Sequence, residues 1–259
     1  MNTSRTNDSD DPSGHGPSIG ATALWGSSQG KRVHLLTPEE RAELAVISSV
    51  VRFKKGTVLY REGDHANGVF NIVSGVVKSY RTLSDGNERI AAFLFPDDLI
   101  GLVEEGRYVN SAKAVTAVTG YKIPVAALET RLRRDPGLEF HVICKLCHEL
   151  REAQRHAFLL GTRHATAKVA MFLQMLDAYQ AARGDSTTEV YLPMSRSDIG
   201  EYIGISLEAV GRSLKALVSR GVIAFRNSRH VKIISRSLLE GMASEAGTRQ
   251  LRPHDWGKD

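Results

Sequence analysis

Cysteine is scarce in this chain: its 259 residues include two, Cys144 and Cys147, which lie close together in the second half. Two thiols in a chain of this length do not form the disulfide framework that stabilises small secreted domains. No apolar run approaches the roughly 20 residues that a membrane-spanning helix needs. The first residues also lack the charged, apolar and small-residue succession of a secretory leader. We therefore expect a cytoplasmic protein with no membrane partner.

Catalytic patterns are missing as well. The sequence has no evident arrangement of serine, histidine and aspartate and no glycine loop suited to a phosphate, so we expect that it is not an enzyme. The net charge of +5 is compatible with binding to nucleic acid but does not identify it. A hydrophobic share of 42% is ample for packed cores, and the length leaves room for two domains.

Changes in composition divide the chain into five predicted parts. Residues 1–32 are rich in serine, glycine, aspartate and asparagine with almost no apolar periodicity, which is typical of a disordered arm. Residues 33–134 consist mainly of short β-type segments, and residues 135–163 have the pattern of one long helix. Residues 164–236 contain helices followed by a hairpin, and residues 237–259 are predicted to form a short helix and a polar tail.

The first folded domain is predicted to begin with a short helix and to continue as a β-barrel or jelly roll. Thr37 is a suitable N-cap, and Pro38 with the carboxylates after it suits the first helical turn. Segments rich in β-branched and aromatic residues follow, and glycine, aspartate and proline separate them. These segments cover residues 51–60, 69–73, 76–80, 90–94 and 112–123.

Two helices joined by a tight turn are predicted between Ser195 and Arg220. Ser195 and Asp198 have the spacing of a capping box at the start of the first helix. Gly204 suits the turn because a residue without Cβ takes positive φ readily, and Ser206 suits the N-cap of the second helix. This order is typical of a helix-turn-helix.

The second helix has an apolar face and a charged face at the same helical spacing. The residues are Val210, Leu214 and Leu217 on the first face and Glu208, Arg212 and Lys215 on the second. Between Ser195 and Lys232, lysine and arginine outnumber acidic residues by 7 to 3, which suits a surface that faces phosphates. Residues 222–225 and 231–234 flank a basic turn and predict a β-hairpin. We interpret the whole as a winged helix-turn-helix that binds DNA; the alternative is an ordinary helical hairpin with solvated charges.

These motifs resemble the CRP/FNR family of transcription regulators, and the detailed pattern resembles its FixK-like branch. The resemblance rests on Phe53-Lys-Lys-Gly56, Tyr60-Arg-Glu-Gly63-Asp64, Val69 to Lys78, Phe95 to Gly101 and Glu208-Ala-Val-Gly-Arg212. It implies an α+β fold with an N-terminal cyclic-nucleotide-binding-like β-roll, a long dimerisation helix and a C-terminal winged helix-turn-helix. It also implies a homodimeric, sequence-specific regulator whose partners are double-stranded DNA, RNA polymerase and a second copy of itself.

Apolar residues of the long helix recur with alternating spacings of three and four, which is the pattern of a coiled-coil seam. They are Ile143, Leu146, Leu150, Ala153, Ala157 and Leu160. A helix that packs this face on its own β-roll is the alternative interpretation. The resemblance implies the dimer interface instead, and a two-fold dimer would place two recognition helices about one DNA turn apart.

The resemblance further implies roles in reading DNA. Arg212 suits a bidentate contact with guanine, and Glu208 suits cytosine and the orientation of Arg212. Leu207 agrees with the FNR-like branch, whereas Gly211 replaces a serine of that branch and leaves the outermost base preference open. The expected operator is a TTGAT-N4-ATCAA-like palindrome. The residues expected to contact backbone phosphates are Ser195, Arg196, Ser197, Ser206, Ser213 and Lys215.

Cyclic nucleotides are held in this family by a Gly-Glu-Leu segment and by an arginine that pairs with the phosphate. In this chain Leu102 occupies the glutamate position and Asn110 the arginine position. Arg107 could replace that arginine only if the loop refolded. We therefore expect no bound nucleotide.

The segment Cys144-Lys-Leu-Cys147-His148 has the formal spacing of a haem-attachment site, but it lies within the predicted helix, so we reject that interpretation. Iron–sulfur relatives need four cysteines, including a cluster in the N-terminal arm that this chain lacks. We expect free thiols and a regulator without a cofactor. The alternative is a sensor of the same family that responds to cyclic nucleotide, to haem or to the redox state of Cys144 and Cys147, and metal binding by these thiols is also open.

Overall fold

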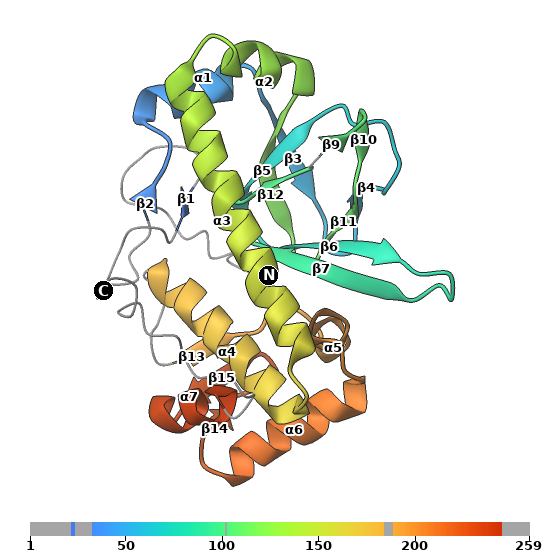
Figure 1. The fold of residues 1–259 in the computed structure, drawn as a ribbon, viewed down its shortest axis with the longest axis vertical. Helices are drawn as coiled ribbons and strands as arrows, with labels where there is room; N and C mark the ends of the chain where they lie inside the picture. Colours follow the sequence, from blue (N-terminus) through green and yellow to red (C-terminus); the bar gives the residue numbers. More distant parts are fainter. Residues whose placement is uncertain (1–21, 24–32, 102, 184–188, 245–259) are drawn as a thin grey trace, which may run out of the picture.

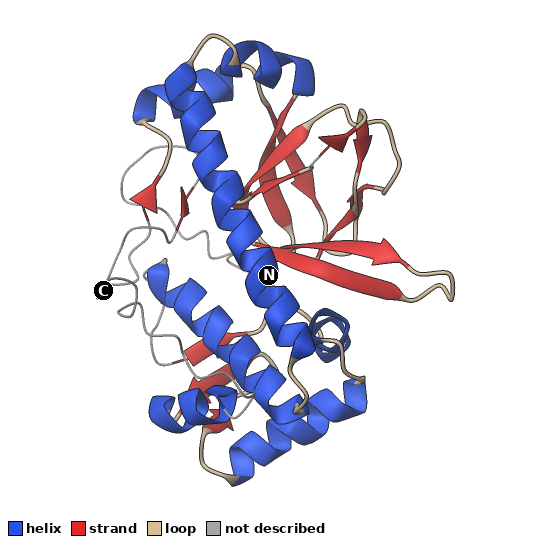
Figure 2. Cartoon of the chain, viewed as in Figure 1, coloured by secondary structure: helices blue, strands red, loops and turns tan. Residues whose placement is uncertain are grey.

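The computed structural model describes residues 22–23, 33–101, 103–183 and 189–244. A β-rich part occupies one end, and a helical part with a small sheet occupies the other (Figure 1, Figure 2). The long helix α3 (Pro136–Gly161) runs along both parts. This confirms the predicted α+β fold, with a β-roll, a long helix and a winged helix-turn-helix in that order.

Two antiparallel four-stranded sheets form the β-roll, with strand orders β4-β11-β6-β7 and β3-β12-β5-β8. The first sheet contains β4 (Val58–Tyr60), β11 (Ser111–Ala114), β6 (Val77–Thr82) and β7 (Glu88–Leu94). The second contains β3 (Ser49–Phe53), β12 (Val118–Ile123), β5 (Val69–Ser74) and β8 (Leu99–Ile100). Their inward-facing side chains form one core that includes Phe70, Ile72, Val77 and Val118.

Two pairs of very short strands accompany the roll. They are β1 (Thr22–Ala23) with β2 (Val33–His34), and β9 (Val103–Glu104) with β10 (Arg107–Tyr108). Strand β1 lies within the predicted disordered arm, residues 1–32. The other residues of that arm lie outside the described part of the chain.

Two of the predicted β segments each divide into two strands. In the segment 51–60 the chain turns at Gly56, whose φ of 84° suits glycine. In the segment 112–123 the amides of Val115 and Thr116 both donate to the carbonyl of Val76, so the ladder is interrupted between β11 and β12.

The other end of the molecule contains four helices and a three-stranded sheet. The helices are α4 (Ala165–Ala182), α5 (Arg196–Ile203), α6 (Leu207–Ser219) and α7 (Arg236–Ser244). The sheet has the order β13-β15-β14 and consists of β13 (Glu189–Tyr191), β15 (His230–Ile233) and β14 (Ile223–Phe225). The predicted hairpin is therefore present, and β13 adds a third strand that was not predicted.

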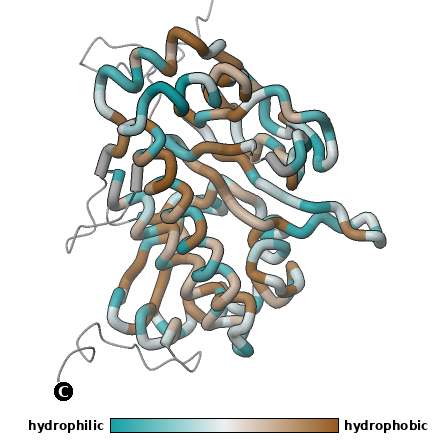
Figure 3. The backbone as a smooth tube through the Cα atoms, turned by 45° about the horizontal axis from the view of Figure 1, so that its top comes forward, coloured by the Kyte–Doolittle hydropathy of each residue, from teal (hydrophilic) through white to brown (hydrophobic). Residues whose placement is uncertain are grey.

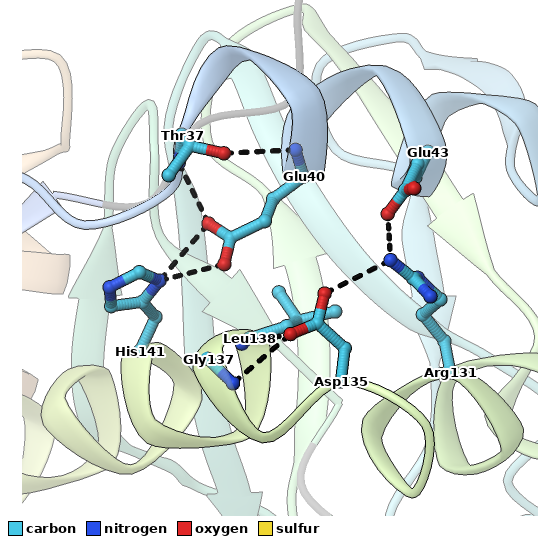
Figure 4. A network of polar contacts seen from close by, with 8 residues as sticks. All are labelled: Thr37, Glu40, Glu43, Arg131, Asp135, Gly137, Leu138 and His141. Carbon is cyan, nitrogen blue, oxygen red and sulfur yellow. Dashed lines mark hydrogen bonds and ion pairs between the residues drawn. The ribbon is translucent and has the colours of Figure 1, made fainter.

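A network of polar contacts fastens the start of α3 to α1 (Pro38–Val46) and α2 (Val125–Leu132) (Figure 4). Thr37 and Glu40 form a capping box, which confirms Thr37 as the N-cap of α1. The carboxylate of Glu40 also lies 3.0 Å from Nδ1 of His141 in α3. Asp135 caps α3 and pairs with Arg131 of α2 at 3.0 Å. These contacts fix the direction in which α3 leaves the roll.

A continuous hydrophobic cluster joins the two ends of the molecule. Phe93 of β7 lies near Phe172 of α4 and Tyr202 of α5, with ring centroids 6.3 Å and 5.1 Å away. Beyond this contact the β6–β7 hairpin projects from the roll, and its outer part is mainly hydrophilic (Figure 3). Among the described helices, none combines the length and apolarity needed to cross a membrane.

Candidate nucleic-acid interface

The start of α5 is held by the predicted capping box. Ser195 Oγ accepts from the amide of Asp198 at 3.0 Å, and Asp198 Oδ2 accepts from the amide of Ser195 at 3.1 Å. The helix ends at Gly204 in the left-handed conformation with φ 69°, as predicted. A Cβ on Gly200 would lie 2.7 Å from the carbonyl oxygen of Ile205, so glycine allows the chain after the turn to pass close to α5. This role of Gly200 was not recognised in the sequence.

Helix α6 has the two opposite faces that were predicted from its sequence. Ser206 caps it by accepting from the amide of Ala209 at 3.2 Å. Its apolar side chains are buried and its charged side chains are exposed. The buried ones are Val210, Leu214 and Leu217, and the exposed ones are Glu208, Arg212 and Lys215. The helix therefore presents a carboxylate, a guanidinium and an ammonium on one side.

Hydrogen bonds hold the carboxylate of Glu208 in its ionised form. Its own amide and the hydroxyl of Ser206 lower the pKa of Glu208 below its ordinary value, and the charge of Arg212 adds a smaller contribution in the same direction. Leu207 begins the helix with 49% of its surface exposed. Gly211 faces open space, since no atom lies within 4 Å of a Cβ built there.

The six expected phosphate contacts do not all lie on the surface. Ser195, Ser197, Ser206 and Lys215 are exposed. Arg196 is half-buried, and its guanidinium lies 5.2 Å from the ring centroid of Phe225. Ser213, by contrast, is only 3% exposed because it lies on the face of α6 that packs against the core. The prediction that Ser213 contacts a phosphate is therefore wrong.

The turn between β14 and β15 forms the wing, and Asn227 organises it. Its Oδ1 accepts from the amides of Arg229 at 2.9 Å and His230 at 3.0 Å, a local bond that favours a tight turn. Arg229 donates from Nη1 to the carbonyl of Pro193 at 2.7 Å, and Arg226 pairs with Glu189 of β13 at 3.4 Å. The wing was predicted as basic, and these contacts engage both of its arginines.

Comparison with known proteins places these two parts in known families. Residues 50–135 match the cyclic nucleotide-binding domain, and residues 167–242 match the Crp-like helix-turn-helix domain. The nitrogen fixation regulation protein FixK of Bradyrhizobium diazoefficiens is 32% identical over 210 residues, which span 81% of this chain and 88% of that protein. The chain belongs to the CRP/FNR family of transcription regulators.

Two further comparisons agree with membership of the CRP/FNR family. The transcriptional activator protein anr of Pseudomonas aeruginosa is 33% identical over 173 residues, which span 66% of this chain and 71% of that protein. The solved structure of FixK2 from Bradyrhizobium japonicum superimposes with a TM-score of 0.70 at 32% identity and covers 76% of this chain and 97% of that one. The predicted resemblance to this family and to FixK is thus confirmed.

The segment that holds the nucleotide in CRP/FNR proteins has other contacts in this chain. Asn110 Oδ1 accepts from Nε of Arg81 at 3.1 Å, and Ser111 Oγ accepts from the amide of Glu62 at 3.0 Å. Arg107 is exposed and donates to the carbonyl of Gly63 at 2.6 Å. Leu102, the other position on which the prediction depended, lies outside the described residues.

A cavity of about 1200 Å³ lies between the β-roll, α3 and α4. Lys145 of α3, which is 1% exposed, lines it and pairs with Asp98 at 2.7 Å and Glu149 at 2.9 Å. Burial alone would lower the pKa of Lys145, but the two carboxylates reverse this effect and raise it. The charge of Lys145 is therefore already neutralised by carboxylates of the protein itself.

The outer face of α3 is apolar and exposed in this chain. All six residues of the predicted seam are exposed: Ile143, Leu146, Leu150, Ala153, Ala157 and Leu160. Phe140 and Phe158 are also exposed, although neither was among the predicted seam residues. The opposite face contains Lys145 and Leu159, which are buried against the same chain. The alternative in which the seam packs on its own β-roll is therefore wrong.

Both cysteines are free thiols. Cys144 is half-buried and Cys147 is exposed on α3. Within the described residues, no three histidine, cysteine or acidic side chains lie close enough together to hold a metal ion.

Proposed function

We propose that this protein is a homodimer that binds a TTGAT-N4-ATCAA-like palindrome and regulates transcription. The observation that carries the proposal is the exposed face of α6, where Glu208, Arg212 and Lys215 stand opposite a buried apolar face. A helix packed in this way can enter the major groove with these side chains directed at base edges.

Within the proposed complex, Arg212 donates two hydrogen bonds to a guanine and Glu208 accepts one from a cytosine. Leu207 offers an apolar surface that suits a thymine methyl group, and Gly211 lets the helix approach the bases closely. Ser195, Arg196, Ser197, Ser206 and Lys215 contact the phosphates and fix the register. The stacking of Arg196 on Phe225 supports this role because it holds the guanidinium at the start of α5.

The proposed dimer forms through α3. A continuous exposed apolar face on a helix of 26 residues is costly in water, and a second copy can cover it by coiled-coil packing. The resulting two-fold symmetry matches the symmetry of a palindromic operator.

We infer that DNA binding needs neither a cyclic nucleotide nor an iron–sulfur cluster. Asn110 brings no positive charge to the phosphate position, and Lys145 in the adjacent cavity already pairs with two carboxylates. A cyclic phosphate would thus be desolvated without compensation of its charge by residue 110 or by Lys145.

A redox-controlled regulator is the second candidate function. Cys147 is exposed next to Leu146 of the proposed seam, so oxidation there would alter the dimer. Sensing through a nucleotide or haem is the remaining alternative. In every case we infer a cytoplasmic protein that acts through RNA polymerase; the name of the relative anr identifies that protein as a transcriptional activator.

A gel-shift titration with the purified, ligand-free protein tests the proposal. The probe is a TTGAT-N4-ATCAA duplex, the control is a duplex with both half-sites scrambled, and each is titrated with and without cAMP and reductant. We expect tight binding to the palindrome, and not to the scrambled duplex, in all four combinations of cAMP and reductant.

Other results of this titration would indicate a different mode of control or a different operator. Binding only with cAMP would show that the segment around Asn110 does hold a nucleotide. Binding only with reductant would make Cys144 and Cys147 the controlling groups. Absence of any preference for the palindrome would contradict the proposed operator.

A further inference from the structure

The carboxylate of Asp198 at the DNA-binding end of the molecule also contacts the β-roll. Asp198 uses Oδ2 for the capping box of α5, where it accepts from the amide and the hydroxyl of Ser195 at 3.1 Å and 2.7 Å. Its other oxygen, Oδ1, lies 2.7 Å from Nζ of Lys78, which comes from β6 of the roll 120 residues earlier. The same side chain therefore forms the start of α5 and fixes it to another domain.

Lys78 is held from both sides. Its Nζ also lies 2.6 Å from Oε2 of Glu88 on β7, and the residue is only 9% exposed. Burial would lower the pKa of Lys78, but hydrogen bonds to Asp198 and Glu88 outweigh it and raise the pKa, so the ammonium stays charged. Lys113 of β11 adds a second, more distant cation at 3.4 Å from Glu88.

From these contacts we propose that Lys78 is a positioning residue for DNA binding, which sets the orientation of α5 relative to the β-roll and neutralises Asp198. The inference rests on the proposed interface, in which Ser195, Arg196 and Ser197 at the start of α5 contact phosphates. Asp198 lies in the same helical turn. A carboxylate there without its cation would face the phosphates with like charge.

Removal of Lys78 would also disturb the junction itself. Glu88 and Asp198 lie within 2.7 Å of the same nitrogen, so without it two carboxylates would be close neighbours in a partly buried place. Such a pair repels and favours separation of β7 from α5. The hydrophobic contacts of Phe93 with Phe172 and Tyr202 remain, so we expect the variant to fold with an altered domain orientation.

The first test compares Lys78→Met with Lys113→Met in gel-shift titrations on the palindrome. Both variants lose one positive charge near Glu88, but only Lys78 contacts Asp198. We expect Lys78→Met to weaken binding by on the order of tenfold or more, since it breaks a partly buried pair. Lys113→Met should stay within about threefold of the wild type, and Lys78→Arg should restore most of the affinity.

Salt dependence separates positioning from a direct phosphate contact. A lysine that binds a phosphate would reduce the slope of log affinity against log salt by about one when removed. We expect the slope of Lys78→Met to equal that of the wild type. An unchanged affinity in Lys78→Met, an equal loss in Lys113→Met or a reduced slope would each overturn the inference.

A double-variant comparison keeps the test decisive if Lys78→Met fails to fold. Asp198→Asn retains a capping oxygen without the charge. In that background, Lys78→Met should change the affinity by less than about threefold, because the Lys78–Asp198 ion pair, to which the proposal assigns the effect, no longer exists. A loss as large as in the wild-type background would contradict the proposal.

Failure of this inference can be distinguished from failure of the proposed function. If the wild-type protein shows no specific binding to the palindrome, both the proposed function and this inference are wrong. If the wild type binds but the Lys78 comparisons do not give the expected results, only this inference is wrong.

Discussion

Glu208 and Arg212 lie one turn apart on the exposed side of α6, and their local surroundings prepare them for different partners. Hydrogen bonds from its own amide and from the hydroxyl of Ser206 keep the carboxylate of Glu208 ionised. Arg212 is exposed, so its guanidinium is available to a base or a phosphate.

Replacement of Arg212 tests this assignment at the level of one residue. Arg212→Ala should cost about 1–3 kcal/mol of binding to the palindrome and reduce the preference over a duplex with that guanine changed. Lys215→Ala is the matched control on the same face, and it should weaken binding to all sequences alike. Fluorescence anisotropy with both duplexes measures these effects. A uniform loss for Arg212→Ala, or a sequence-specific loss for Lys215→Ala, would contradict the roles assigned here.

His148 provides a test of the inner face of α3. Burial lowers the pKa of His148 to about 4, and the charge of Lys145 adds to this effect. Because the folded pKa lies below the ordinary value of 6.5, neutral His148 contributes stability that is present above pH 6.5 and is lost as the pH falls toward 4.

We therefore expect the free energy of unfolding of the wild type to fall relative to that of His148→Gln between these two pH values. Urea denaturation followed by circular dichroism at several pH values measures the difference. A difference between wild type and His148→Gln that does not vary with pH would contradict the prediction.

At the scale of elements, α3 carries two different faces along its whole length. Lys145 and Leu159 face the chain's own domains and are buried. The residues of the seam face outward, and Leu150 has 61% of its surface exposed. Both faces follow from the helical period, but only the inner one is covered within a single chain.

Substitution in the seam should separate the proposed dimer into monomers. Leu150→Glu places a charge in an apolar interface, and it should lower the mass in solution from twice 28.4 kDa to the mass of one chain. Leu238→Glu on α7 is the control, because Leu238 is similarly exposed but lies outside α3. Sedimentation velocity measures both masses. A dimeric Leu150→Glu variant, or a wild type that is already monomeric, would argue against the seam.

At the scale of the whole molecule, the β-roll and the DNA-binding domain share one core. The cluster that contains Phe93, Phe95 and Ile90 of the roll also contains Phe172 and Tyr202 of the other domain. Domains that share apolar surface of this kind unfold together rather than independently. The Lys78–Asp198 pair lies beside this cluster and adds a polar contact of defined direction.

Phe93→Ala tests the shared core. Loss of this buried ring should lower the free energy of unfolding by about 3 kcal/mol and affect both domains. Leu83→Ala at the exposed end of the β6–β7 hairpin should have little effect. Hydrogen exchange measured by mass spectrometry reports each domain separately. Faster exchange confined to the β-roll would show that the two cores are independent.

Features that depend on residues close together in the chain could be predicted from the sequence. The capping boxes at Thr37 and Ser195, the left-handed Gly204 and the two faces of α6 all follow from spacings of a few residues, because helix period and cap geometry are local. The order of the β segments was also readable, although not the breaks within two of them. Resemblance to a known family then supplied the arrangement of the whole chain.

Contacts between side chains far apart in the sequence could not be predicted and are seen in the folded chain alone. Lys78 and Asp198 are 120 residues apart, and Asp98 and Lys145 are 47 apart, so no periodic pattern connects them. The burial of Ser213 depends on how tightly α6 packs, and the need for Gly200 depends on the path of the chain after the turn. Such pairings are fixed by packing, because a side chain has a definite partner only after the elements that carry it have docked.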